Sequence, residues 1–181
     1  MRQLYWDREG AFTPEACDRL IARADAAAME RGTVYGASGY AENAAVRQVE
    51  TSWHKRGAET AWFYDRLDAL FAEAGEALGA PVRAMGEDIQ IMRYTAGCHF
   101  QMWHSDAGYD QIGRRLISVS VELSDKEDYD GGNLEIVPDL LGRERTVGRG
   151  GARFFFSQAL HRVTPVTRGV RYALVNWTGA A

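Results

Sequence analysis

The sequence predicts one domain of the α+β class, mainly β: a jelly roll with two long helices of its N-terminal half packed outside. Three observations predict it: two amphipathic segments in the first 80 residues, short alternating segments after residue 81, and glycine-rich turns between them. A chain of 181 residues can enclose one substantial core, so we expect a single domain over residues 1–181. Residues 13–80 are expected to give helical support, and residues 86–178 most of the β core.

The first helix is predicted to begin at Thr13, whose side chain can cap it, with Pro14 at its first position. It should end near Gly32. The second is predicted from Glu59 to Leu78, with a glycine following as the stop signal. The second helix carries one apolar stripe, formed by Phe63, Leu67, Leu70, Phe71, Ala74 and Leu78. Such a stripe is typical of core packing, so both helices are expected to support the sheet.

Seven or eight short strands are predicted. Residues 4–12 predict a strand and a turn, residues 33–45 a loop, and residues 46–53 a strand. Alternation then predicts strands at 88–95, 115–123, 133–137, 152–157 and 172–177. In the segment 115–123, apolar side chains share one face, and Ser118, Ser120 and Glu122 share the other.

Composition excludes several classes of function. The chain is 46% hydrophobic with a net charge of −4, which gives no electrostatic reason to expect a nucleic acid or an anionic membrane as partner. It has no signal-peptide pattern at its start and no apolar run of membrane-spanning length, so we expect a cytoplasmic protein. Cys17 and Cys98 form no Cys-x-x-Cys pair, and Cys17 is expected to be a buried free thiol.

His104 and Asp106 are separated by one residue, so on an extended strand their side chains would point to the same face. With His161 from a distant strand they could form the two-histidine, one-carboxylate set of non-haem iron sites, which leaves positions open for other ligands. His-x-Asp alone is a weak signal, because an isolated histidine is more often a hydrogen-bonded core residue. His99 could compete as a ligand, but its odd separation from His104 predicts the opposite face.

Arg171 follows His161 by ten residues. A permanently charged arginine deep in a barrel needs a carboxylate partner, and a dicarboxylate that reaches in from the metal could supply one. Tyr94 could add a hydroxyl donor to that carboxylate. The alternative for Arg171 is a salt bridge at the end of a strand, and the sequence leaves both open.

These residues belong to a larger pattern. A tyrosine, a glycine and an aromatic residue precede the His-x-Asp pair, a Leu-Ser segment leads to a Gly-Gly-x-Leu turn, and a histidine precedes a basic residue. The pattern reads Tyr94, Gly97, Phe100, His104 and Asp106, then Val121-Glu-Leu-Ser124 and Tyr129-Asp-Gly-Gly-Asn-Leu134, then His161 and Arg171. From about residue 13 to residue 177, the chain therefore resembles the Fe(II)/2-oxoglutarate-dependent oxygenase superfamily, in its prolyl 4-hydroxylase-like branch.

The resemblance implies a double-stranded β-helix with Fe(II) on His104, Asp106 and His161, and the distal carboxylate of 2-oxoglutarate on Arg171 and Tyr94. It implies a dioxygenase that uses O2 and couples decarboxylation of 2-oxoglutarate to hydroxylation of an unactivated C–H bond. It leaves ascorbate open as an additional cofactor. The substrate also stays open: a prolyl residue, another protein side chain, or a small molecule such as a free amino acid.

Trp103 and Arg47 are the side chains expected to contact the substrate, and residues 35–40 and 125–130 are the candidate lids. One departure from the family pattern is an extra residue between Phe100 and His104, which predicts a bulge within residues 101–103. The alternative function is a non-catalytic, cupin-like module that binds a metal or ligand. A zinc hydrolase is disfavoured, because no glutamate accompanies a histidine pair at helical spacing.

Overall fold

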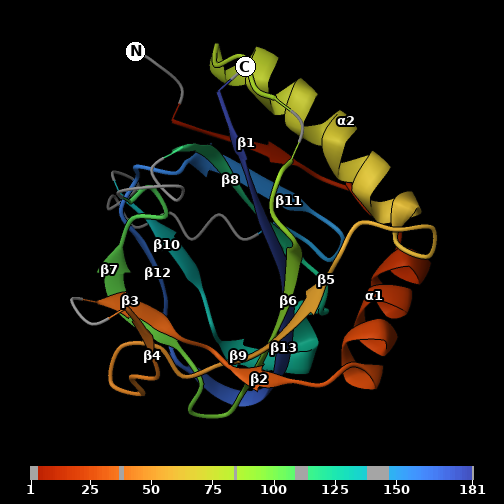
Figure 1. Cartoon of the computed structure of the whole chain (residues 1–181). Coiled ribbons are helices and arrows are strands. Elements are labelled where there is room, and N and C mark those ends of the chain that lie inside the picture. The colour runs from red at the N-terminus through yellow and green to blue at the C-terminus, as the bar shows by residue number, and fades with distance from the viewer. Residues whose placement is uncertain (1–3, 37–38, 84, 109–113, 138–146, 181) are drawn as a thin grey trace.

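The computed structural model describes residues 4–36, 39–83, 85–108, 114–137 and 147–180. Its largest element is an antiparallel sheet (Figure 1). The strands of this major sheet are, in spatial order, β1 (Tyr5–Arg8), β11 (Ala152–Phe156), β8 (Arg115–Glu122), β13 (Val166–Gly179), β6 (Ile89–Thr95), β5 (Glu50–His54) and β2 (Glu30–Arg31). A further strand, β9 (Tyr129–Gly131), pairs with the first part of β13.

A minor sheet of three antiparallel strands completes the β core. It consists of β10 (Leu134–Ile136), β12 (His161–Val163) and β7 (Phe100–His104). In Figure 1 the minor sheet lies on one side of the major sheet and both helices lie on the other. Two sheets that enclose a common interior form the predicted jelly roll.

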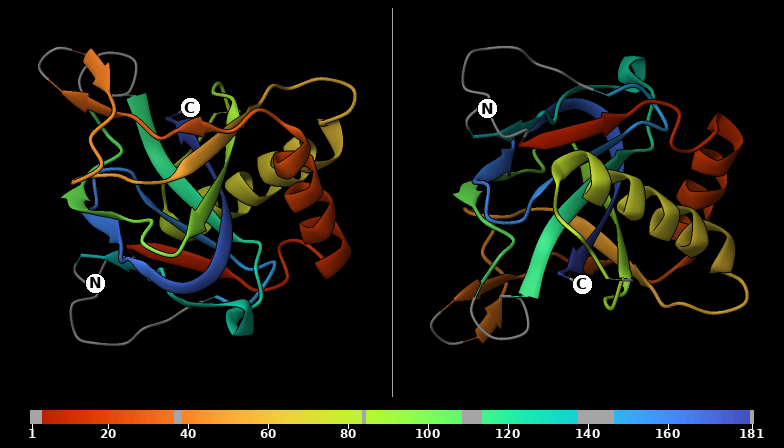
Figure 2. Two further views of the ribbon diagram at one scale, coloured as in Figure 1. Left: turned by 90° about the horizontal axis from the view of Figure 1, so that it is seen from below. Right: turned by 90° about the horizontal axis from the view of Figure 1, so that it is seen from above.

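The two helices cover the outer face of the major sheet, as both views of Figure 2 show. Helix α1 (Pro14–Ala26) begins where the Thr13 side chain accepts a hydrogen bond from the Ala16 amide at 3.2 Å. Helix α2 (Ala61–Leu78) ends at Gly79, whose φ of 62° is the left-handed conformation that glycine adopts without strain. The Phe71 ring packs edge-on against Phe154 of β11, with ring centroids 5.2 Å apart.

Alternation along the strands decides which side chains face the helices. Ile117, Val119 and Val121 of β8 are at most 1% exposed and belong to the core under the helices. Their neighbours Ser118 and Glu122 are also buried, but they bond to groups inside the barrel. The predicted fold class and the predicted faces of this strand are therefore confirmed.

The prediction of a loop at residues 33–45 was wrong, because these residues include a β-hairpin. Strand β3 (Val34–Gly36) pairs with β4 (Gly39–Ala41), and Tyr35 lies opposite Tyr40 in the register. Glycines at both inner ends of the hairpin obscured its alternation. Residues 37–38, within the first candidate lid, lie outside the described residues.

The structure describes thirteen strands rather than seven or eight, since strands of two or three residues leave no recognisable pattern. Strand β5 begins at Glu50, later than predicted, and α1 ends at Ala26, before the expected end near Gly32. The second candidate lid contains a single 3-10 turn, η2 (Lys126–Asp128), followed by β9. Within the described residues, no helix has the length and apolar character needed to cross a membrane.

Cys17 lies on the buried face of α1 as a free thiol with no exposed surface, which confirms its prediction. Burial raises the pKa of this thiol to about 11, so it stays protonated at neutral pH. The second cysteine, Cys98, is buried and free as well.

Candidate metal centre and its cavity

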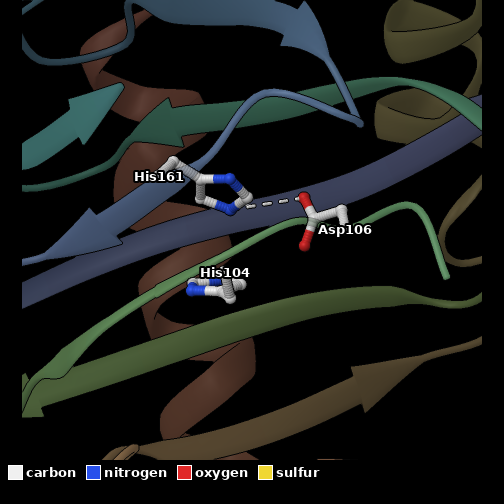
Figure 3. A group of neighbouring side chains, drawn as sticks. All are labelled: His104, Asp106 and His161. Atoms are coloured by element: carbon white, nitrogen blue, oxygen red, sulfur yellow. Dashed lines mark ion pairs between the residues drawn. The ribbon is translucent and has the colours of Figure 1, made fainter. Parts of the chain in front are cut away.

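His104, Asp106 and His161 converge inside the barrel (Figure 3). His104 ends β7 and His161 begins β12, and the two lie directly opposite each other in the minor sheet. Asp106 follows β7, rather than lying within the strand as the spacing suggested. One potential ligand atom from each side chain lies within 4.8 Å of the others.

The predicted bulge is present between Phe100 and His104. Phe100 pairs with Val163 and His104 with His161, so β7 has three residues between its paired positions where β12 has one. The bulge lets the Phe100 ring stack on the His104 imidazole, with centroids 3.6 Å apart. His99 lies outside the three-residue cluster, and its Nδ1 accepts a hydrogen bond from the Gln101 amide at 3.3 Å.

Backbone carbonyl groups orient both imidazoles. Nδ1 of His104 lies 2.9 Å from the Met102 carbonyl oxygen, and Nδ1 of His161 lies 3.0 Å from that of Ala159. A carbonyl oxygen only accepts, so each Nδ1 carries a hydrogen, and in the neutral form of the ring Nε2 has the lone pair that binds a metal. Burial, reinforced by the neighbouring His161, lowers the pKa of His104 to about 4, so this imidazole is neutral at physiological pH.

Two serines hold Asp106 in position. The Ser118 hydroxyl donates to its Oδ2 at 2.7 Å and lies 2.9 Å from the Ser157 hydroxyl. The Asp106 amide donates to the Ser157 carbonyl oxygen at 2.9 Å. Burial acts to raise the pKa of the Asp106 carboxyl, but the two histidines and the hydrogen bonds from Trp177 and Ser118 outweigh it and lower the pKa. Alternation in the sequence places Ser118 on the polar face of its strand but does not indicate this role.

The donor set suits a first-row divalent metal. Two imidazoles and one carboxylate on one side of a cavity match the ligands of non-haem iron sites. Nε2 of His161 lies 3.5 Å from Oδ2 of Asp106 (Figure 3), so these two atoms can contact one ion after small adjustments.

A cavity of about 750 Å³ adjoins this cluster, and His104, Asp106 and His161 all line it. Arg171 and Tyr94 line the same cavity, on the major-sheet side. Its volume is within the range of small-molecule sites, which is about 300–1,000 Å³. The structure therefore brings the three predicted metal ligands and the two residues predicted to bind the co-substrate to one cavity.

Arg171 already has a carboxylate partner in the chain. Its Nε donates to Oε2 of Glu122 at 2.9 Å, and both side chains are buried. The Arg171 guanidinium lies 5.5 Å from the Tyr94 ring centroid, while the Tyr94 hydroxyl donates to the sulfur of Met92 at 3.4 Å. Burial raises the pKa of the Glu122 carboxyl, and Arg171 opposes this shift.

Glu122 is the functional-site residue that sequence reasoning missed. The sequence pattern that could have indicated it is the alternation that places Glu122 on the same polar face as Ser118 and Ser120. The adjoining Gly132 has a φ of +60°, and a Cβ there would lie 3.0 Å from Cδ of Arg171. The Gly-Gly turn thus leaves room for the Arg171 side chain.

Of the two predicted substrate contacts, only Arg47 is among the described residues that line the cavity. Trp103 instead packs against Arg162, whose guanidinium carbon Cζ lies 4.7 Å from the centroid of the Trp103 ring. Of the candidate lids, the hairpin contributes Tyr40 to the cavity. The other candidate lid, residues 125–130, forms two ion pairs with the rest of the chain: Arg149–Asp125 at 3.0 Å and Arg168–Asp130 at 2.6 Å.

Residues 89–179 match the sequence profile of the 2OG-Fe(II) oxygenase superfamily. The chain belongs to this superfamily. A PKHD-type hydroxylase of Synechococcus sp. is 39% identical over 92 residues, which cover 49% of this chain and 41% of that protein. The PKHD-type hydroxylase PiuC of Pseudomonas aeruginosa is 37% identical over 91 residues, which cover 47% of this chain and 40% of that protein. The match thus spans well under half the length of these relatives.

Solved structures of the superfamily share the whole fold. A prolyl-4-hydroxylase of Pseudomonas putida superposes with a TM-score of 0.76 at 18% identity and covers 98% of this chain and 92% of its own. A viral collagen prolyl hydroxylase from Paramecium Bursaria Chlorella virus-1 gives 0.68 at 20% identity, covering 99% and 97%. The similarity at this identity supports the jelly roll and carries no substrate assignment.

Proposed function

We propose that this chain is an Fe(II)- and 2-oxoglutarate-dependent dioxygenase that hydroxylates an unactivated C–H bond. The observation that carries the proposal is the convergence of His104, Asp106 and His161, with both imidazole Nε2 atoms available and the carboxylate held by Ser118. These three side chains would hold Fe(II). The metal, with 2-oxoglutarate and O2, would supply the oxidation chemistry.

The remaining residues of the cavity would position the reactants. Arg171 would bind the distal carboxylate of 2-oxoglutarate through its Nη edge, since its Nε already donates to Glu122. Tyr94 would line the same subsite and, after leaving the Met92 sulfur, donate its hydroxyl to that carboxylate. The enclosed barrel would exclude water and hold the substrate carbon near the metal.

The substrate would be a prolyl or other protein side chain or a free amino acid. A prolyl hydroxylase from Trichoplax adhaerens with the same fold was solved with a peptide fragment of hypoxia inducible factor. Ascorbate would be an additional cofactor, and neither nucleic acid nor membrane would be a partner. We further propose that residues 1–181 act as one domain, in the cytoplasm.

The alternative is a cupin-like module that binds a metal or ligand without turnover. One observation favours it: Glu122 already neutralises Arg171, so the arginine does not require a dicarboxylate ligand for its charge to be balanced. The active dioxygenase remains the better proposal, because a metal-binding module without turnover would not need a buried arginine at the same cavity as its metal ligands.

Anaerobic absorption spectroscopy tests the proposal. The metal-free protein is titrated with Fe(II) and then with 2-oxoglutarate, and a visible charge-transfer band is expected. His161→Ala should lose the band and Arg171→Ala should weaken it. His99→Ala is the matched control: it removes a neighbouring histidine outside the cluster and should keep the band.

Arg171→Ala leaves the Glu122 carboxylate buried alone, so the double variant with Glu122→Ala is measured beside it to separate misfolding from lost co-substrate binding. Folding of each variant is checked by circular dichroism. Folded, iron-loaded wild-type protein that forms no band would overturn the dioxygenase and favour the binding module.

A further inference from the structure

Three arginines of the described residues line the cavity, and they differ in their partners. Arg171 donates to Glu122 at 2.9 Å, and Nε of Arg115 donates to Glu87 at 2.6 Å. Arg47 has no carboxylate partner among the residues that the structure describes. The cavity therefore contains one guanidinium that makes no ion pair in the described part of the chain.

Every described contact of the Arg47 guanidinium is with a neutral group. Nη1 donates to the Thr33 carbonyl oxygen at 2.9 Å, and Nη2 makes two long contacts, with Oε1 of Gln90 at 3.4 Å and Sδ of Met92 at 3.5 Å. Its Nε is buried without a hydrogen-bond partner in the described structure. Arg47 is partly buried, and a partly buried charge with incomplete hydrogen bonding costs stability, so such a group is typical of a binding site.

The chain makes room for this guanidinium beside the metal ligands. A Cβ at Gly32 would lie 2.8 Å from Nε of Arg47, so only glycine fits there without a shift. On its other side, Cζ of Arg47 lies 5.1 Å from the ring centroid of Phe100, the ring that stacks on His104. Burial lowers the pKa of Arg47, while Tyr94 and Asp106 act in the opposite direction.

We propose that Arg47 binds a carboxylate of the substrate, and that the substrate is a small carboxylic acid of the size of a free amino acid. The inference rests on the proposed function, because it assumes that the cavity holds the reacting substrate. A guanidinium presents paired N–H donors that fit a carboxylate. Because Arg47 lines the cavity beside Phe100, the carboxylate must enter the cavity, which favours a small acid over a folded protein surface.

A carboxylate probe tests the site without knowledge of the substrate. Benzoate and its neutral counterpart benzamide are titrated into the protein, with and without Fe(II) and 2-oxoglutarate under anaerobic conditions, and binding is followed by NMR. We expect benzoate to bind and benzamide not to bind. Arg47→Met should weaken benzoate binding about tenfold or more, the scale of one charged hydrogen-bonded contact.

Arg115→Met is the matched control, since it makes the same substitution in the same cavity at an arginine that has a carboxylate partner. It should leave benzoate affinity within about twofold. Equal binding of benzamide, or an equal loss in both variants, would overturn the proposal. The melting temperature gives a second readout: Arg47→Met should raise it, because the substitution removes a partly buried charge that makes no ion pair, and a fall would indicate a structural role instead.

The 2-oxoglutarate titration identifies the source of the carboxylate. If Arg47→Met leaves the charge-transfer band and its midpoint unchanged, the carboxylate belongs to the substrate; a weaker band would assign it to the co-substrate and overturn the proposal. If the wild type forms no band, the dioxygenase proposal fails, while the benzoate titration still decides whether Arg47 is a carboxylate site.

Discussion

The two faces of the major sheet differ in what their buried side chains do. On the helix side, Ile91 and Val119 pack with Phe71 in an apolar core. On the barrel side, β8 buries Ser118 and Glu122, which bond to Asp106 and Arg171. One face therefore stabilises the fold by hydrophobic burial. The other face holds polar groups in a cavity, which lowers the net stability of the fold.

Successive side chains of a strand point to opposite faces, so one segment of sequence supplies both the apolar face and the polar face. Burying a polar group without a partner costs stability, so the described polar groups on the barrel side are mostly paired with one another. Substitutions on the helix side should change stability and leave ligand binding intact. Substitutions on the barrel side should change ligand binding more than they change the fold.

The largest effect is expected on the helix side, for Phe71→Ala. This ring is 1% exposed and packs against Phe154, and its removal should lower the free energy of unfolding by about 3–5 kcal/mol. Urea denaturation measures the change. At temperatures where the variant stays folded, its Fe(II) affinity should match that of the wild type. A parallel loss of Fe(II) binding would contradict the claim that helix-side substitutions leave ligand binding intact.

On the barrel side, Glu122→Gln should have opposite effects on the free and the loaded protein. The variant leaves Arg171 without its buried counter-charge, so the metal-free protein should lose about 3 kcal/mol of stability. The distal carboxylate of 2-oxoglutarate would become the counter-charge, so 2-oxoglutarate affinity should rise. Calorimetric melting and the anaerobic titration measure the two effects, and unchanged affinity would contradict the assignment of Arg171 to 2-oxoglutarate.

A smaller effect is expected for Ser118→Ala, which removes the hydrogen bond to Oδ2 of Asp106 and keeps the strand. Fe(II) affinity should fall about 10–100-fold, the usual effect of losing a group that orients a metal ligand. Ser120→Ala is the matched control, because Ser120 lies on the same face of β8 without a described bond to the metal ligands. A similar loss in both variants would indicate a general change in the strand.

The sequence predicts how side chains divide between the faces, because capping residues, glycine stops and alternation are local signals. It also predicts that His104, Asp106 and His161 meet, through the motif that contains them. It cannot predict that Glu122 reaches Arg171, since this contact depends on the register in which β8 lies against β13. The short hairpin at Tyr35 was missed because its glycine-rich strands carry little pattern.

The smallest effect concerns pH and His104. Its pKa is about 4 in the folded protein, chiefly because of burial, against an ordinary value of 6.5. The unfolded chain therefore takes up the proton first as the pH falls. The stability that His104 contributes to the metal-free protein is complete above about pH 6.5 and is lost towards pH 4, by at most about 1.4 kcal/mol per pH unit.

Urea denaturation of the metal-free wild type and of His104→Gln, at several values between pH 7 and pH 4.5, isolates this contribution. The wild type should lose stability faster than the variant, because the glutamine binds no proton in either state. Groups outside the metal cluster, including His54, whose pKa is lowered by burial and by Arg23, contribute equally to both proteins and cancel in the difference. Parallel curves would mean that His104 titrates normally in the fold, and the cavity would then be more hydrated than its buried polar face implies.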